Sequence, residues 1–320
     1  MNSGIGNNGI GEQHPACRLS RGFLEFFDDR RSSGQAVALV AVTRTRGSSY
    51  SKAGHLVLVD KVGRFAGLVS GGCLESDLAQ HAASVLERNE RAFVDYDLRN
   101  DDDVLGLGVG CDGVIHLVIE PLSPANGYEP LAATVDRLAD SACAEVTLPR
   151  DAGEEHAPAR FRLFRPANIL VLGAGPDALP LLQMIDALGW RATVSDHRQH
   201  YVDTLRQSQS AVVHCNPAQE IARHVNLAQF DAAIVMSHNL TADRAYLEAL
   251  SRSEIAFIGL LGPPHRRERL LDDLGGETAG LLDGRLRSPV GRRIGGRGPA
   301  AIALEIAAEL QEYVCSLESA

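Results

Sequence analysis

The hydrophobic positions in the first half of the chain form short apolar runs separated by loops rich in glycine. Leu19, Phe23, Phe26 and Phe27 recur at helical spacing, which predicts an amphipathic helix ending near Gly34. Other apolar runs predict strands at 35–43, 56–59, 65–72, 92–98 and 114–121, with a second helix over 74–88. This order of elements is typical of an α+β domain.

From Asn168 onward the pattern changes to apolar strands that alternate with helices. The predicted strands are the runs NILVL, RATVSD, AVVHC, AAIVM and IAFIG, and the last helix is predicted over Pro299–Leu317. Strands that are apolar throughout are buried on both faces, as in a doubly wound parallel sheet. We therefore predict an α/β protein in which an N-terminal α+β domain precedes a C-terminal Rossmann-like domain.

The length of 320 residues and the apolar content of 45% are sufficient for two domain cores. A stretch rich in proline, glycine and charge, PRDAGEEHAPAR, interrupts the two patterns. We expect the N-terminal domain at 17–145, a linker at 146–166 and the Rossmann-like domain at 167–320.

Charge and cysteine content narrow the classes of function. The net charge of −10 disfavours a general nucleic-acid binder, and no leader or membrane segment is apparent, so we expect a cytoplasmic protein. Six cysteines occur without a CxxC pair or zinc-site spacing, and we expect reduced thiols. Four of them, Cys17, Cys143, Cys215 and Cys315, are interpreted as core or incidental residues.

The first candidate site is a Rossmann signature. Gly173, Gly175 and Ala178 have G-x-G-x-x-A spacing between a predicted strand and helix, and Asp196 follows at the end of the next strand. Such glycines allow close backbone approach to an anion, and the acid can accept from ribose hydroxyls. Alternatively, this is a Rossmann fold with an altered pocket, because Pro176 removes one N–H donor.

Further polar residues follow the strands of the same domain. Arg198, beside Asp196, could favour a phosphate or a pterin-linked anion over plain NAD. His238, with Asp243 downstream, follows another strand, where α/β sheets bind ligands. The segment His265-Arg266-Arg267 could add positive charge at this rim.

Two cysteines lie in glycine-rich loops of the N-terminal domain. Ser70, Gly71, Gly72 and Cys73 stand between a strand and a helix, where helix N–H groups stabilise a thiolate. Cys111 lies in a second loop, GLGVGCDG. If the loops converge, Cys73 and Cys111 could contact molybdenum or sulfur as soft ligands. The alternative is a buried structural cysteine beside turn glycines.

A basic, hydroxyl-rich loop is the third candidate. Arg46, Ser48, Ser49 and Lys52 combine charge, hydroxyls and a flexible Gly47, which suits the binding of phosphate groups. A solvated hairpin loop would have a similar composition.

The combined motifs resemble the XdhC/CoxI family over about residues 35–315. The blocks that carry the resemblance are TRTRGSSYSKAGHLVLV, GLVSGGCLE, GLGVGCDGVIHLVIEP, VLGAG, VMSHN, FIGLLG and the closing IGGRGPAAIAL. The family consists of accessory proteins for xanthine dehydrogenase and related molybdenum hydroxylases. The resemblance therefore implies a molybdenum cofactor chaperone without turnover, and it aligns the family's two loop cysteines with Cys73 and Cys111.

The resemblance also implies a cofactor and partners. The cofactor is molybdopterin with molybdenum, either plain or as the cytosine dinucleotide. The partners are an apo molybdenum hydroxylase, a cysteine desulfurase that assists sulfuration, and a second copy in a homodimer. The chain departs from the family at Ser51–Ala53 and Pro176–Ala178, which puts the form of the cofactor in doubt. Two alternatives are an NAD(P)-dependent oxidoreductase, which would use the Rossmann signature, and a cysteine-based sulfur carrier.

Overall fold

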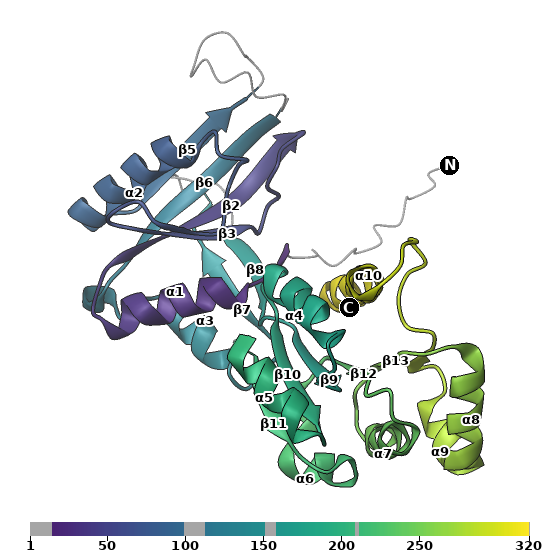
Figure 1. Cartoon of the computed structure of the whole chain (residues 1–320). Coiled ribbons are helices and arrows are strands. Elements are labelled where there is room, and N and C mark those ends of the chain that lie inside the picture. Colours follow the sequence, from purple (N-terminus) through teal and green to yellow (C-terminus); the bar gives the residue numbers. More distant parts are fainter. Residues whose placement is uncertain (1–14, 99–112, 151–157, 209–210, 320) are drawn as a thin grey trace, which may run out of the picture. The chain divides into compact units, whose positions relative to one another are not determined.

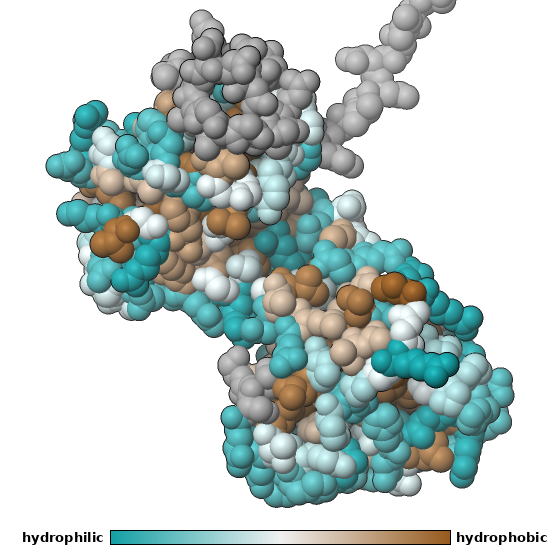
Figure 2. Space-filling model, turned by 45° about the horizontal axis from the view of Figure 1, so that its top comes forward, coloured by the Kyte–Doolittle hydropathy of each residue, from teal (hydrophilic) through white to brown (hydrophobic). Residues whose placement is uncertain are grey.

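The computed structural model describes residues 15–98, 113–150, 158–208 and 211–319. The chain divides into two compact units, Met1–Arg165 and Pro166–Ala320. Each unit has hydrophobic cores of its own. Figure 2 shows hydrophobic residues (brown) in separate patches among hydrophilic residues (teal) on the face in view.

An antiparallel five-stranded sheet of order β4-β3-β2-β6-β5 organises the first unit. Its strands are β2 (Val37–Gly47), β3 (Leu56–Asp60), β4 (Phe65–Ala66), β5 (Ala92–Asp97) and β6 (Gly113–Leu122). Helix α2 (Glu75–Arg88) covers one face, because Leu78, Ala82 and Val85 pack against side chains such as Val40 and Leu117. Figure 1 shows α2 lying along this sheet.

The opposite face of the sheet packs against helices and a small second sheet. These elements are β1 (Ala16–Arg18), α1 (Arg21–Ser32), η1 (Pro124–Asn126), α3 (Leu131–Arg137), β7 (Cys143–Leu148) and β8 (Ala159–Phe164). The small sheet has the order β1-β8-β7. Phe23 and Phe27 from α1 share this core with Leu39 from β2 and Phe161 from β8. The phenylalanines that predict the first helix thus form its buried face.

The expected linker at 146–166 differs from the structure. Strand β7 extends to Leu148, and all of β8 lies inside the expected range, where the two strands form an antiparallel pair. The alternation of buried and exposed positions in Ala159–Phe164 is that of a strand with one buried face. The two units divide between Arg165 and Pro166.

A six-stranded parallel sheet of order β11-β10-β9-β12-β13-β14 organises the second unit. Its strands are β9 (Asn168–Leu172), β10 (Arg191–Asp196), β11 (Val212–Cys215), β12 (Ala232–Val235), β13 (Phe257–Leu260) and β14 (Leu286–Arg287). The strand order reverses between β9 and β12, which is the arrangement of a Rossmann fold. This confirms the predicted fold of the C-terminal half.

Helices cover both faces of the parallel sheet. One face packs against α4 (Ala178–Ala187), α5 (Gln199–Ser208) and α10 (Pro299–Glu318). The other packs against α6 (Ile221–His224), α7 (Leu240–Ser251), α8 (Pro264–Leu274) and α9 (Gly276–Leu282), with η2 (Ala218–Glu220) and η3 (Leu227–Gln229) in the connections. Among the helices of the described ranges, none combines the length and apolar content that crossing a bilayer requires.

Candidate functional site

The predicted binding loops of the first unit leave from one end of the five-stranded sheet. Strand β2 ends there at Gly47 and β3 begins at Leu56, while β4 runs antiparallel to β3 and leads back to that end. Strand β5 ends and β6 begins at the same end, because Asp97 is paired with Val114. Loops 48–55 and 67–74 therefore lie together at what we call the loop end.

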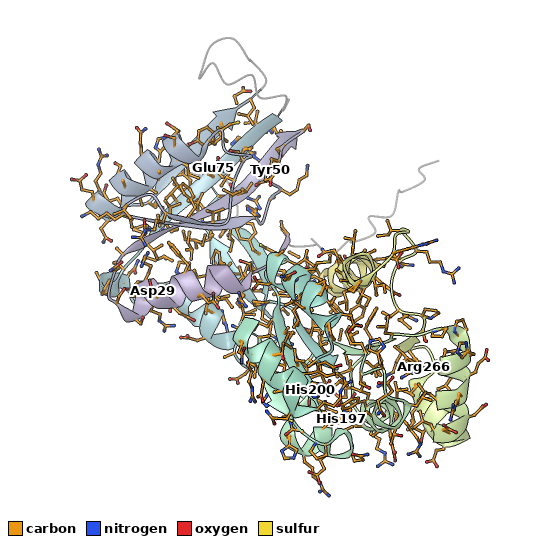
Figure 3. The ribbon with its side chains drawn as sticks, viewed as in Figure 1. Asp29, Tyr50, Glu75, His197, His200 and Arg266 are labelled. Atoms are coloured by element: carbon orange, nitrogen blue, oxygen red, sulfur yellow. The ribbon has the colours of Figure 1, made fainter. Side chains whose placement is uncertain are left out.

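Hydrogen bonds join these two loops. The Ser51 hydroxyl donates to the carbonyl of Val69 at 2.7 Å, and the Ser49 hydroxyl donates to the carbonyl of Ser51 at 2.7 Å. Ser49 and Ser51 are both buried. Figure 3 labels Tyr50, which lies in the first loop, and Glu75, which directly follows the second. Ser49 therefore supports the loop from within.

A network centred on Ser70 shapes the turn that carries Cys73. The Ser70 hydroxyl donates to the Glu75 carboxylate at 2.5 Å and accepts from the N–H groups of Gly72 and Leu74. The Ser70 N–H also donates to Glu75, at 2.8 Å. Burial alone would raise the pKa of Glu75, but these hydrogen bonds outweigh it and hold the pKa below its ordinary value.

Cys73 is half-buried and stands two residues before the first residue of α2. Gly71 and Gly72 are exposed beside it, and Gly72 has a φ of +112°, a conformation that favours glycine. A ligand can thus approach this backbone closely. Cys111 lies outside the described residues, so its convergence with Cys73 stays a prediction.

The remaining residues of the basic loop are exposed. Arg46, Ser48 and Lys52 lie on the surface, and Tyr50 exposes 63% of its area beside them. Within the ranges that the structure describes, no ion pair involves Arg46 or Lys52. These cations are therefore available to an anionic ligand at the loop end.

In the second unit, Gly173 is required by close packing within the protein. Its φ is +133°, and a Cβ at this position would lie 2.5 Å from the carbonyl oxygen of Met236. Gly175 is buried, and a Cβ there would lie 2.8 Å from Oδ1 of Asp177. The first glycine of the motif thus lets the turn after β9 reach the end of β12.

Asp196 is bound to protein donors on both carboxylate oxygens. Oδ2 accepts from the N–H of Ala174 and from Arg198 Nη2, each at 2.7 Å, while Oδ1 accepts from Arg198 N at 2.9 Å and Arg198 Nε at 3.0 Å. The side chain is fully buried. Burial alone would raise its pKa, but the hydrogen bonds hold the pKa below its ordinary value. A ribose contact, as the sequence predicts, would require these bonds to break.

Arg198 and His238 also have partners within the unit. The Arg198 guanidinium is paired with Asp196 and lies 4.4 Å from the centre of the Tyr201 ring. His238 has a φ of +59°, and its Nε2 lies 2.7 Å from a carboxylate oxygen of Asp177. The latter pair joins the end of β12 to the start of α4, next to the point where the strand order reverses.

A buried network occupies the neighbouring strand end. Ser237 donates to the Asp243 carboxylate, which also pairs with Arg266 Nη2 at 2.7 Å. Ser237 and Asp243 are fully buried. The charge of Arg266, which the sequence predicts at a binding rim, is neutralised by Asp243. His265 is exposed and Arg267 is half-buried.

A cavity of about 440 Å³ lies beside this network, at the carboxyl ends of β10, β11 and β12. Its lining residues are His197, Cys215, Asn216, Pro217, Ala218, Gln219, Asn239, Thr241 and Ala242. Figure 3 labels His197 at this part of the second unit. The sequence prediction missed Asn216 and Asn239, although the position of Asn216 directly after a strand was a signal for this cavity.

We also searched the described parts of the chain for metal-binding groups and looked at the cysteines. Residues 15–98, 113–150, 158–208 and 211–319 contain no group of three or more histidine, cysteine or acidic side chains suited to a metal ion. Among the described residues, the free cysteines are Cys17, Cys73, Cys143, Cys215 and Cys315.

The chain thus contains an α+β unit that carries a thiol and hydroxyl groups at its loop end, and a second unit with a Rossmann fold. Residues 169–310 match the XdhC Rossmann domain, and residues 30–97 match the XdhC and CoxI family. The chain belongs to the XdhC and CoxI family.

Relatives and a solved structure match along nearly the whole chain. A Bacillus subtilis protein described as a probable subunit of xanthine dehydrogenase is 28% identical, over 90% of this chain and 96% of its own. The molybdenum cofactor insertion chaperone PaoD from Escherichia coli is 24% identical, over 91% of this chain and 87% of its own. A crystal structure from Bacillus halodurans, described as a xanthine dehydrogenase, has a TM-score of 0.78 and 25% identity, covering 93% of this chain and 96% of that one.

Proposed function

We propose that this protein is a molybdenum cofactor chaperone. It binds and stabilises the cofactor, assists its sulfuration and inserts it into an apo molybdenum hydroxylase of the xanthine or aldehyde dehydrogenase type. The observation that carries the proposal is the meeting of the Cys73 turn with the hydroxyl- and cation-bearing loop at one end of a sheet. The match to PaoD over 91% of the chain supports it.

The donor set of the loop end fits such a cargo. A cysteine thiolate is a soft ligand for molybdenum or for transferable sulfur. The exposed Gly71 and Gly72 leave room for a flat pterin to approach the backbone. Arg46 and Lys52 supply charge for the phosphate group of the cofactor, with Ser48 as a hydroxyl partner.

Partners and location follow from the same proposal. The client is an apo hydroxylase. A cysteine desulfurase carries the sulfur as a persulfide, and its outer sulfur passes to the thiolate of Cys73 or Cys111 as the S–S bond to the desulfurase breaks and the desulfurase thiol is released. The protein acts in the cytoplasm as a homodimer. The cofactor is either plain or in the cytosine dinucleotide form, and the amide side chains of Asn216, Gln219 and Asn239 line a cavity of the second unit that is suited to a base. Amide side chains can both donate to and accept from a base edge.

The alternative functions use different residues. An NAD(P)-dependent oxidoreductase would need Asp196 for the ribose, and this carboxylate is held by Arg198 and Ala174. A sulfur carrier would need only the thiol of Cys73 or Cys111, without a bound pterin.

The test is retention of isolated molybdenum cofactor and reconstitution of an apo-hydroxylase. We expect Cys73→Ser and Cys111→Ser each to weaken cofactor retention at least about tenfold, a difference of about 1.4 kcal/mol. Cys143→Ser is the matched control, because Cys143 is exposed on β7 in the same unit. Normal retention by both loop variants would refute the cysteine assignment. Tight NAD binding without cofactor binding would refute the chaperone proposal.

A further inference from the structure

A β-bulge in β2 sets the direction of two arginines. Val42 pairs with Leu117 of β6, but Arg44 pairs with His116, so Thr43 is an extra residue on β2. Val42 and Leu117 lie on the α2 face of the sheet. Successive side chains of a strand point to opposite faces of the sheet. His116 precedes Leu117, so His116 and its partner Arg44 lie on the face away from α2.

The chain beyond β7 reaches the same place. The Thr43 hydroxyl lies 3.2 Å from the carbonyl oxygen of His116 and 3.5 Å from that of Arg150. Thr43 is buried. Arg150, which follows β7, is thus held beside the bulge. The backbone of Arg150 therefore lies near the bulge at which Arg44 and His116 are paired. We call these three basic residues, Arg44, His116 and Arg150, the bulge cluster.

Each member of the bulge cluster has a buried nitrogen without a partner among the described residues. These atoms are Arg44 Nε, His116 Nε2 and Arg150 Nε. Asp95 lies 2.7 Å from the other ring nitrogen of His116 and so fixes the ring orientation. Neither Arg44 nor Arg150 forms an ion pair with a carboxylate in the described parts of the chain. Buried N–H groups without acceptors are uncommon in folded proteins, and the two arginine Nε–H groups near the bulge indicate an acceptor from outside the chain.

We propose that the bulge cluster binds a phosphate group. Two guanidinium forks match the geometry of phosphate oxygens. Two arginines balance a dianion better than a carboxylate monoanion. Arg46 pairs with Val114 on the same face and adds an exposed cation at the rim. Only the identity of the natural ligand, the phosphate group of the cofactor, rests on the proposed function.

The direct test is calorimetric titration of the full-length protein with inorganic phosphate, with acetate as a monoanionic comparison. We expect saturable phosphate binding at least tenfold tighter than acetate binding. Arg44→Gln and Arg150→Gln should each weaken phosphate binding at least tenfold. Arg160→Gln is the matched control: it removes an exposed arginine of β8 in the same unit and should leave the affinity unchanged. No saturable binding, or equal binding by all variants, would overturn the proposal.

Two further measurements distinguish a lost binding site from a failure to fold, and distinguish this inference from the proposed function. If Arg44→Gln fails to fold, Arg44→Lys keeps the charge but loses the fork, and a weakening of phosphate binding by less than about threefold would count against the site. Free phosphate and phosphorylethanolamine are compared next, because a site for an esterified phosphate should bind both. Phosphate binding without cofactor retention would contradict only the proposed function. Cofactor retention that is unchanged in Arg44→Gln and Arg150→Gln, with no phosphate binding, would contradict only this inference.

Discussion

The loop end of the first unit and the carboxyl end of the parallel sheet in the second unit satisfy their polar groups differently. In the second unit, Asp196 is paired with Arg198, Asp243 with Arg266, and Asp177 with His238. In the first unit, Arg46 and Lys52 are exposed beside Cys73, and the bulge cluster holds buried donors without partners in the described part of the chain. A nucleotide-type motif can thus be used to hold the fold, while a loop of ordinary appearance has donors available for a ligand.

The largest effect should come from removing the buried charge of Asp196 in the second unit. Asp196→Asn leaves the largely buried Arg198 guanidinium without its anion. We expect the free energy of unfolding to fall by about 3–5 kcal/mol. Urea denaturation followed by circular dichroism measures this, with Asp203→Asn on the exposed face of α5 as the control. A stable variant with weakened nucleotide binding would instead mean that Asp196 serves a ligand.

The pH dependence of stability sharpens the same prediction. The pKa of Asp196 is lower in the folded protein than its ordinary value of about 3.9. Its stabilisation is therefore fully present above that value and is lost as the pH falls through the lower, folded pKa. The difference in stability between wild type and Asp196→Asn should shrink between about pH 5 and about pH 2, the range over which such carboxylates titrate. A constant difference over this range would contradict the assignment.

A smaller effect is expected from crowding the turn after β9. Gly173→Ala places a Cβ against the Met236 carbonyl at a positive φ, which we expect to cost about 2–4 kcal/mol of stability. Gly276→Ala is the matched control, because Gly276 begins α9 and a Cβ there meets no atom within 4 Å. The control should be neutral or slightly stabilising. Equal thermal unfolding of the two variants would show that the close approach to β12 is unimportant.

The smallest of these effects should come from the first unit. Ser70→Ala removes the hydroxyl that links Glu75 to the turn, and we expect a loss of about 1–2 kcal/mol together with faster alkylation of Cys73. Ser76→Ala, an exposed substitution in α2, serves as the comparison. Alkylation rates measured by mass spectrometry decide the point. An unchanged rate would mean that Ser70 does not shape the turn around the thiol.

Long periodic segments made most of the fold predictable. The continuous apolar strands from Asn168 indicated the parallel sheet, and the α1 phenylalanines indicated their own buried face. The sequence places β8 in the linker, because six residues between a charged stretch and Pro166 give a weak signal. Pairing with β1, far away in the sequence, stabilises this strand in the fold.

The site was less predictable than the fold, because hydrogen-bond partners depend on tertiary contacts. Asp196 has the spacing of a ribose acceptor, yet only the fold shows that the N–H of Ala174 reaches it. Arg44, His116 and Arg150 are separated in the sequence, and no single motif contains all three. The pairing of Arg44 with His116 depends on strand register, and the position of Arg150 depends on the path of the chain beyond β7; a single sequence specifies neither.

The bulge at Thr43 makes residue count as important as residue identity in β2. If the pairing ran on without the bulge, Thr43 would lie opposite His116, and Arg44 would lie opposite Ile115 and turn toward the apolar core under α2. A gap misplaced by a single position when relatives are aligned would likewise assign these arginines to the wrong side of the sheet. Comparisons across the family should therefore be anchored on strand pairing at this point, before any inference is drawn from which amino acids are shared.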